Sequence, residues 1–184
     1  MKNKIQLSQF NNQWYNPGRG ILLRIIWYCV NVCFIKSSHP FSFLRVYLLR
    51  LFGSKIGKGV VIKPSVNIKY PWRLIIGNYV WIGENVWIDN LDNIEIGNNV
   101  CISQGAMLLS GNHNYKKHSF DLIIAPIILE DGVWIGAKAI VTGGTICKNH
   151  SMLAVASVAP KIMEAFSIYR GNPAIKIRER IIEA

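Results

Sequence analysis

Residues 129–159 read LEDGVWIGAKAIVTGGTICKNHSMLAVASVA, and every sixth residue of this stretch is apolar. The position four residues after each of the first five apolar residues is small or β-branched. An α-helix repeats its faces every 3.6 residues and cannot produce a fixed period of six, whereas short strands interrupted by tight turns can. The two series are Leu129, Ile135, Val141, Cys147, Leu153 and Ala159, and then Val133, Ala139, Thr145, Ser151 and Ser157.

The same six-residue unit organises the chain upstream, from Gly53 onward. Equally spaced short strands indicate an all-β parallel solenoid, expected here over residues 53–163, in which each apolar residue stacks on its counterpart one coil further on. Gly follows the apolar residue in five units, and we expect these glycines and the Asn, Asp and Lys residues after them to supply turns with positive φ. The expected inward-pointing residues include Ile82, Ile88, Ile96, Ile102, Leu108, Ile135, Val141, Cys147 and Leu153.

The period breaks after Ile68, after Ile88 and after Leu108. At the first two places the next apolar residue comes eight residues later, which predicts a two-residue bulge at a corner. After Leu108 the interval is 21 residues, one unit plus 15 extra residues. The extra residues predict a long extruded loop at 111–126, and a long loop without structure of its own in a compact repeat domain is usually functional.

The chain of 184 residues is 51% apolar and 17% charged, which predicts one folded domain with a sizeable core. Its net charge of +11 comes from residues 1–83, which hold 12 Lys and Arg residues and no Asp or Glu. Such a basic front predicts an anionic partner, either nucleic acid or membrane. The apolar character of the same region favours a membrane over nucleic acid.

Two apolar segments lie in this basic front, at 21–35 and 41–52, and both predict helices. Neither is expected to span a bilayer, which needs ~20 apolar residues, because both are short and contain Arg. No signal peptide is expected either. Residues 1–52 are expected to form an N-terminal amphipathic segment, and 164–184 a C-terminal extension. Two interpretations stay open for the helices, a cap packed on the solenoid or a layer in the interface of an anionic membrane.

The sequence contains few reactive groups. The four cysteines lack the spacing of a metal site and are expected to be reduced core residues of a cytoplasmic protein. There is no phosphate-binding glycine loop and no paired-carboxylate motif. The cysteines are Cys29, Cys33, Cys101 and Cys147.

Two of the four histidines, His113 and His118, lie in the extruded loop. Counting units places Ile88 and Leu108 on one side of the solenoid in successive coils, so Asp89 is expected about one strand spacing, ~4.8 Å, from Leu109. His113 can then fold back over this carboxylate. It is a candidate general base, with Asp89 fixing its tautomer or holding a substrate hydroxyl.

Several motifs of the chain resemble the hexapeptide-repeat acyltransferases. The resemblance covers about residues 15 to 180 and is greatest to the acetyltransferases of colanic acid and related exopolysaccharide clusters, with galactoside and maltose acetyltransferases more distant. It implies a left-handed parallel β-helix, assembly as a homotrimer and acetyl-CoA as co-substrate. The motifs are NVWIDNLD (85–92), CISQGA (101–106), SGNHNY (110–115), FDLI (120–123) and DGVWIGAKAI (131–140).

The resemblance also implies roles for individual residues. The catalytic base of the family falls on His113, and its acceptor-binding Asn falls on Asp89, with Asn90 beside it. The coenzyme contacts include two cations that suit the phosphates of coenzyme A. These contacts fall on Trp134, Ala137, Val155, Pro160, Lys161 and Arg178.

The chain departs from the family pattern at four places. Asn114 stands where an Asp is common, and Pro160 stands where a Thr contacts the coenzyme. Ile175 stands where a further Arg binds phosphate, and the turn at 148–151 lacks its usual Gly.

Together these observations predict an O-acetyltransferase that transfers acetyl from acetyl-CoA to a sugar hydroxyl in polysaccharide or glycan biosynthesis. We expect His113 to act as base, a backbone N–H near Gly136 or Ala137 to stabilise the oxyanion, and neither a covalent intermediate nor a metal to be required. The expected acceptor is a sugar or lipid-linked glycan at the inner membrane surface, with no role for nucleic acid.

Two alternatives share this architecture. A γ-type carbonic anhydrase would bind zinc, and His113 and His118 imitate its loop His pair. Catalytic zinc needs three protein ligands, however, and the third His of that family falls near Gly77, where this sequence has none. The other alternative is a non-catalytic scaffold at the membrane surface.

Overall fold

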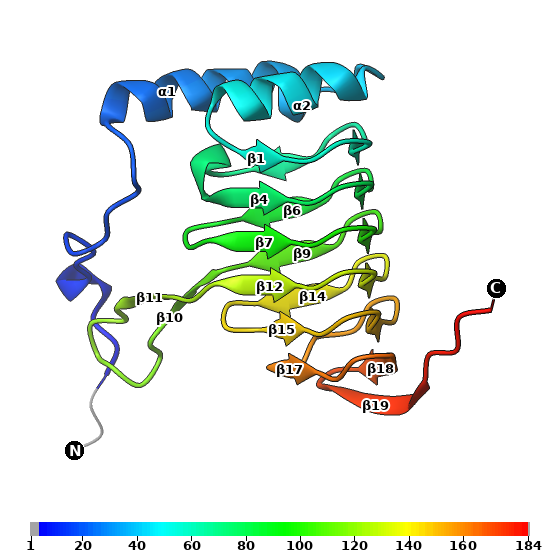
Figure 1. The fold of residues 1–184 in the computed structure, drawn as a ribbon. Helices are drawn as coiled ribbons and strands as arrows, with labels where there is room; N and C mark the ends of the chain where they lie inside the picture. The colour runs from blue at the N-terminus through cyan, green and yellow to red at the C-terminus, as the bar shows by residue number, and fades with distance from the viewer. Residues whose placement is uncertain (1–3, 184) are drawn as a thin grey trace.

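The computed structural model describes residues 4–183 (Figure 1). A stack of short parallel strands forms the body of the molecule, two helices lie across one end, and an antiparallel pair of strands closes the other. The predicted fold class, a parallel β-solenoid with an N-terminal helical segment, is confirmed.

Three sheets form the faces of the solenoid, and the chain visits them in turn. The first face contains β1 (Lys55–Ile56), β4 (Leu74–Ile76), β7 (Ile94–Ile96), β12 (Ile127–Leu129), β15 (Ile146–Cys147) and β17 (Ile162–Met163). The second contains β2 (Val61–Ile62), β5 (Trp81–Ile82), β8 (Cys101–Ile102), β13 (Trp134–Ile135), β16 (Met152–Leu153), β18 (Ser167–Gly171) and β19 (Ala174–Glu179), the last one antiparallel. The third contains β3 (Asn67–Ile68), β6 (Trp87–Asp89), β9 (Met107–Leu109) and β14 (Ile140–Thr142).

The core consists of apolar residues stacked from coil to coil. Ile82 pairs in register with Ile102, and Ile102 with Ile135. All nine residues expected to point inward are buried, with at most 2% of their surface exposed. Since burial of one such side chain contributes about 1.5–3 kcal/mol, the repeated stack supplies most of the stability of the fold.

The corners correct one expectation about glycine. Positive φ occurs three residues after the inward residue of a unit, at Asn85 (58°), Gly105 (68°) and Lys138 (56°) in successive coils. The glycine directly after that residue does not adopt it. At Gly136, a Cβ atom would lie 2.7 Å from the Leu153 carbonyl oxygen of the next coil. These glycines are therefore needed for the close approach of neighbouring coils rather than for the turn.

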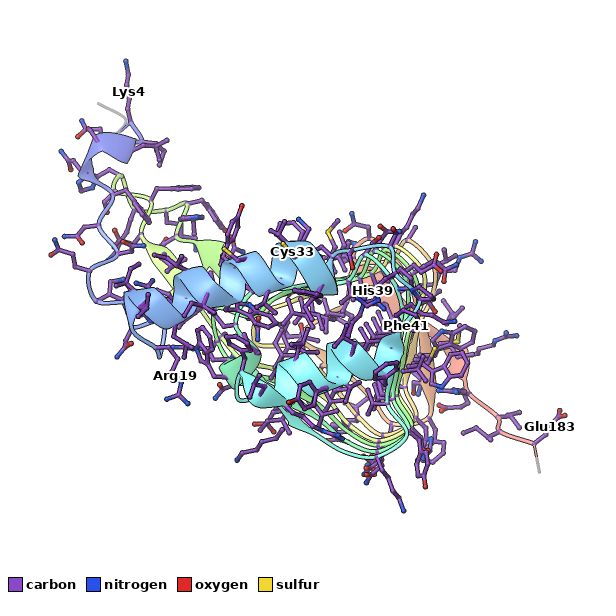
Figure 2. All side chains as sticks on the ribbon, turned by 90° about the horizontal axis from the view of Figure 1, so that it is seen from above. Lys4, Arg19, Cys33, His39, Phe41 and Glu183 are labelled. Carbon is purple, nitrogen blue, oxygen red and sulfur yellow. The ribbon has the colours of Figure 1, made fainter. Side chains whose placement is uncertain are left out.

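The N-terminal helices match the expected segments. They are α1 (Ile21–Val30), which continues into the π-helical turn η2 (Asn31–Ile35), and α2 (Ser42–Leu51). Figure 2 shows the two helices side by side across the end of the solenoid. Trp27 on α1 and Leu49 on α2 are buried in the core cluster. The helices thus cap the apolar end of the stack. The expectation that all four cysteines lie in the core is wrong for Cys29 and Cys33, which are exposed because they lie on helix positions that do not face the solenoid.

The connection between the helices depends on Arg45, which is fully buried. Its guanidinium donates hydrogen bonds to the carbonyl oxygens of Ile35, Ser37 and His39. Burial lowers the pKa of this side chain below its ordinary value. The three carbonyl acceptors compensate for the cost of burying a cation.

The extra residues after Leu108 have a structure of their own, in contrast to the structureless loop expected from the sequence. They form a hairpin in which β10 (Gly111–His113) pairs antiparallel with β11 (Leu122–Ile124). The hairpin projects sideways from the solenoid, and the N-terminal segment with η1 (Leu7–Gln9) lies along it (Figure 1). The Gln6 N–H donates to the carbonyl oxygen of His118 at 2.7 Å.

Candidate active site

One corner of the solenoid, where the third face ends, aligns several of the expected site residues. Asp89 pairs in register with Leu109, as the count of units predicted. The N–H and hydroxyl of Ser110 donate to the carbonyl oxygen of Asp89 at 3.2 and 3.0 Å. One coil further on, the Gly143 N–H donates to the carbonyl oxygen of Leu109. The Lys161 ammonium donates to the carbonyl oxygen of Gly143. Asp89, the root of the hairpin and Lys161 therefore lie along one corner.

His113 is held at the end of β10 by two aromatic rings. Its imidazole stacks on the ring of Phe120, with ring centres 4.5 Å apart and an angle of 8° between the planes. The ring of Phe10, tilted relative to the imidazole, has its centre 5.6 Å away. Its Nδ1 lies 2.9 Å from the carbonyl oxygen of Phe120. Because a carbonyl oxygen can only accept, Nδ1 carries the proton. The lone pair of the neutral ring is then on Nε2, where a base needs it.

Asp89 is engaged with a lysine rather than with His113. The Lys69 ammonium lies 2.9 Å from a carboxylate oxygen of Asp89, whose side chain is 17% exposed, in a geometry not aligned for a hydrogen bond. Within residues 4–183 no hydrogen bond joins His113 to Asp89. The carbonyl of Phe120 takes the orienting role considered for Asp89. The other role considered for Asp89, holding a substrate hydroxyl, is compatible with this position.

Asn90 is fully buried beside Asp89. Its Oδ1 accepts from the Tyr70 N–H at 2.9 Å, and its Nδ2 donates to the Tyr70 carbonyl oxygen at 2.6 Å. Both ends of the amide are therefore used to fix the neighbouring coil. This geometry suits an orienting role for Asn90, since it sets the backbone next to Asp89.

The outer part of the hairpin is organised by Asp121. Its carboxylate accepts hydrogen bonds from the Ser119 hydroxyl at 2.6 Å and the Lys117 ammonium at 2.9 Å, and these bonds lower the pKa of the carboxyl. Its carbonyl oxygen accepts from the N–H of Asn114, the residue that departs from the family pattern. His118 lies in this outer part, where its backbone carbonyl meets Gln6.

The residues expected to contact coenzyme A fall into three places. Trp134 on β13 and the corner residues Ala137 and Val155 lie close together, because the Ala156 N–H donates to the Ala137 carbonyl oxygen in the adjacent coil. Val155 is 64% exposed. Pro160 and Lys161 follow the third face, and Arg178 lies on β19 opposite Ile168. One chain therefore does not gather all six residues into one pocket.

One backbone group at this corner is suited to stabilise an oxyanion. The Gly136 N–H donates to the Leu153 carbonyl oxygen at 2.8 Å and is occupied. The Ala137 N–H makes no hydrogen bond to any part of the chain between residues 4 and 183. Of the two groups considered from the sequence, Ala137 is the one available to a ligand.

Sequence reasoning missed the N-terminal contribution to the site. Phe10 packs on His113, and the Tyr15 hydroxyl donates to the Leu91 carbonyl oxygen at 2.8 Å, which anchors the segment near Asp89. Burial raises the pKa of Tyr15 to about 12. The repeat pattern begins at Gly53 and carries no signal for these contacts.

Two further observations concern the residues that the structure describes. Between positions 4 and 183, no three His, Cys, Asp or Glu side chains converge in a group able to hold a metal ion. None of the helices in the same range combines the length and the apolarity needed to cross a bilayer.

The solenoid with its inserted hairpin is the fold of the hexapeptide-repeat acetyltransferases, since one of them from Vibrio cholerae superposes with a TM-score of 0.78 at 24% identity over 86% of this chain and 90% of that chain. No family model matches the chain. It is 36% identical over 167 residues to the "Putative colanic acid biosynthesis acetyltransferase WcaF" of Escherichia coli strain K12, over 91% of this chain and 92% of that protein. The chain therefore belongs to this family of acetyltransferases.

Two other proteins resemble the chain more distantly. The galactoside O-acetyltransferase of Escherichia coli strain K12 is 25% identical over 148 residues, covering 78% of this chain and 73% of that protein. A hexapeptide-repeat acetyltransferase of Vibrio cholerae, solved in complex with acetyl coenzyme A, superposes with a TM-score of 0.78 at 22% identity over 88% of both chains. The structural likeness shows the shared fold.

Proposed function

We propose that the protein transfers the acetyl group of acetyl-CoA to a hydroxyl of a sugar acceptor in polysaccharide or glycan biosynthesis, with His113 as general base. The observation that carries this proposal is the hydrogen bond from Nδ1 to the Phe120 carbonyl, which leaves Nε2 as the acceptor. Support comes from the relatives, which are named for colanic acid biosynthesis and galactoside O-acetylation.

In the proposed reaction, Nε2 of His113 takes the proton of the acceptor hydroxyl while its oxygen attacks the thioester carbonyl. The carbonyl electrons move to oxygen, and the Ala137 N–H donates to the resulting oxyanion. The intermediate collapses with cleavage of the C–S bond, and the proton on His113 passes to the leaving thiolate. Both substrates are bound together, so no covalent enzyme intermediate forms. General-base catalysis of this kind contributes about 10²- to 10⁴-fold.

We assign the coenzyme to Trp134, Ala137, Val155, Pro160, Lys161 and Arg178, and the acceptor to Asp89 with Asn90 as its orienting neighbour. The two cations would pair with phosphate groups. The separation of these residues on one chain supports a homotrimer. Each site would then be built from the hairpin of one subunit and the coenzyme-binding residues of the next.

We further propose that the enzyme acts in the cytoplasm and contacts the inner membrane surface through residues 1–52. The outward faces of the cap are apolar and strongly exposed (Figure 2). Residues spaced by four lie on one face of a helix, and the basic region around them contains no acid. The outward residues are Leu22 (70% exposed) and Ile26 (44%) on α1, and Phe43 (73%), Tyr47 (61%) and Leu51 (66%) on α2.

The proposed activity can be tested by following coenzyme A release with free sugars, nucleotide sugars and lipid-linked sugars as acceptors. We expect release that depends on the acceptor and that His113→Ala abolishes almost completely. A correctly assembled protein that acetylates none of the acceptors would instead favour the scaffold. Stoichiometric bound zinc with CO₂ hydration would favour the carbonic anhydrase.

A further inference from the structure

A groove of about 470 Å³ opens beside the Asp89 carboxylate, between the α1–η2 helix and strands β3 and β6. Three cations from different elements line it, Arg24 on α1, Lys36 after η2 and Lys69 after β3. Among the described residues that line the groove, Asp89 is the one acid. The groove is therefore a positively charged space that begins at the proposed acceptor position.

Two polar side chains of the groove wall make hydrogen bonds to the protein, whereas two shielded polar atoms, Nε of Arg24 and Oδ1 of Asp89, make none within residues 4–183. The Asn31 amide donates to Asn67 at 2.9 Å, and the Trp27 indole donates to the Ile68 carbonyl oxygen at 3.1 Å. The Nε of Arg24 is shielded from solvent and has no hydrogen-bond partner within residues 4–183. Arg24 lines the groove, so its guanidinium is placed to donate to an oxygen of a ligand bound there.

We infer that this groove binds the phosphate or diphosphate of a phosphorylated sugar acceptor. This inference rests on the proposed function, because Asp89 would hold the sugar hydroxyl at the mouth of the groove. Three cations against one carboxylate leave an excess of two positive charges. A phosphate monoester carries about −1.5 to −2 at neutral pH and balances this excess. Arg24 offers the planar set of donors that matches phosphate oxygens.

The walls of the groove suit the rest of such an acceptor. Trp87 lies on β6 beside Asp89 and is 41% exposed, so its ring is available to pack on the apolar face of a sugar. Ile25 on α1 and Val32 on η2 form an apolar side. Phosphorylated sugars occur as soluble nucleotide sugars and as sugars joined through a diphosphate to a membrane lipid. The groove recognises the chemistry that the two share.

The test compares wild type with the double variant Arg24→Gln/Lys36→Gln and with Lys58→Gln, which removes a cation outside the groove. Acceptors of one sugar are offered as the methyl glycoside, the nucleoside diphosphate sugar and the polyprenyl diphosphate sugar in detergent. We expect the double variant to raise KM for a diphosphate acceptor at least about tenfold, with kcat and the methyl glycoside reaction unchanged. Lys58→Gln should match wild type. The diphosphate acceptor with the larger wild-type kcat/KM shows whether the phosphate belongs to a nucleotide sugar or to a lipid-linked sugar.

Calorimetric binding of the nucleoside diphosphate sugar and of a soluble, short-chain prenyl diphosphate sugar separates this inference from the proposed function, since binding needs no turnover. Binding of either ligand that the double variant loses would support the groove even if no acetyl transfer occurred. Acetyl transfer with equal KM values in the double variant and wild type would overturn the groove and leave the proposed function standing. An equal rise of KM for the methyl glycoside in the double variant would also overturn the groove proposal, since the cations would then not act on phosphate.

Discussion

A single carbonyl oxygen, that of Phe120, decides which nitrogen of His113 can act as a base. The bond at 2.9 Å assigns the proton to Nδ1, and the stacked ring of Phe120 together with the tilted ring of Phe10 fixes the plane of the imidazole. At the scale of the residue, the proposed catalyst is therefore prepared by its own hairpin and by the N-terminal segment. No change of tautomer is needed before it accepts a proton.

For His113→Ala we expect kcat to fall by about 10²- to 10⁴-fold, because the general base is lost, while the melting temperature stays nearly unchanged. His118→Ala is the matched control. It lies in the outer part of the same hairpin and should retain almost full activity. Steady-state kinetics with thermal unfolding checks both, and a His113→Ala enzyme with more than about half of wild-type activity would falsify the base assignment.

The exposed cations Lys161 and Arg178 give a second expectation at this scale. Replacing each with Ala should raise KM for acetyl-CoA and leave KM for the acceptor unchanged, because the coenzyme phosphates lose a partner. The effect should shrink between low and high salt, since exposed charge pairs are screened beyond about 10 Å at 0.1 M. Unchanged constants in both variants would contradict the coenzyme assignment.

The position of Asp89 could be predicted from the sequence, but the surroundings of His113 could not. Asp89 and Leu109 occupy equivalent places in successive repeats, so counting was enough to pair them. Phe10 contacts His113 because the N-terminal segment, which has no repeat, packs on the hairpin. The Phe120 carbonyl lies beside His113 because of the register in which β10 and β11 pair. Both contacts follow from tertiary packing, which a one-dimensional period does not encode.

At the scale of the element, the strength of the solenoid comes from how closely successive coils approach. The period and the buried residues were predictable, because a six-residue repeat admits one stacked arrangement. The role of the glycines that follow five of the inward residues could not be predicted, since it depends on the backbone of a coil distant in sequence. A Cβ atom on Gly136 would meet backbone atoms of residues 153–155 at 2.7–2.8 Å.

We therefore expect Gly136→Ala to lower the free energy of unfolding by about 1–3 kcal/mol, since the neighbouring coil would have to move. Gly20→Ala is the control. A Cβ atom added to this glycine, which directly precedes α1, would have no other atom within 4 Å, so the replacement should cost less than about 1 kcal/mol. Urea unfolding measures both changes, and equal stability of the two variants would contradict the packing explanation.

The two cap helices give the expectation for membranes. The protein should co-sediment with anionic vesicles and bind neutral vesicles much less, because the apolar outer faces are surrounded by an acid-free basic region. Phe43→Glu should weaken binding at least about fivefold, whereas Ile181→Glu, at an exposed position near the other end, should not. Equal binding to neutral and anionic vesicles would contradict the electrostatic contribution to membrane binding. If the protein bound neither, the helices would serve only as a cap on the solenoid.

At the scale of the whole molecule, we propose that neighbouring chains share the site. The hairpin bears the proposed base, while the residues assigned to the coenzyme are spread over the faces of the solenoid. Light scattering should give a mass about three times the 20.8 kDa of one chain at micromolar concentration. A mass near that of one chain would contradict the shared site, because no neighbouring subunit would supply the coenzyme-binding residues.

The hairpin leaves and rejoins the solenoid at almost one point. The Ala125 N–H donates to the Ser110 carbonyl oxygen at 3.0 Å, and Leu129 then pairs with Ile96 as though nothing had been inserted. The entropy of closing an insertion grows only slowly with its length. Evolution can therefore lengthen, shorten or exchange this segment without altering the register of the coils, and an engineer can graft another hairpin at the same point.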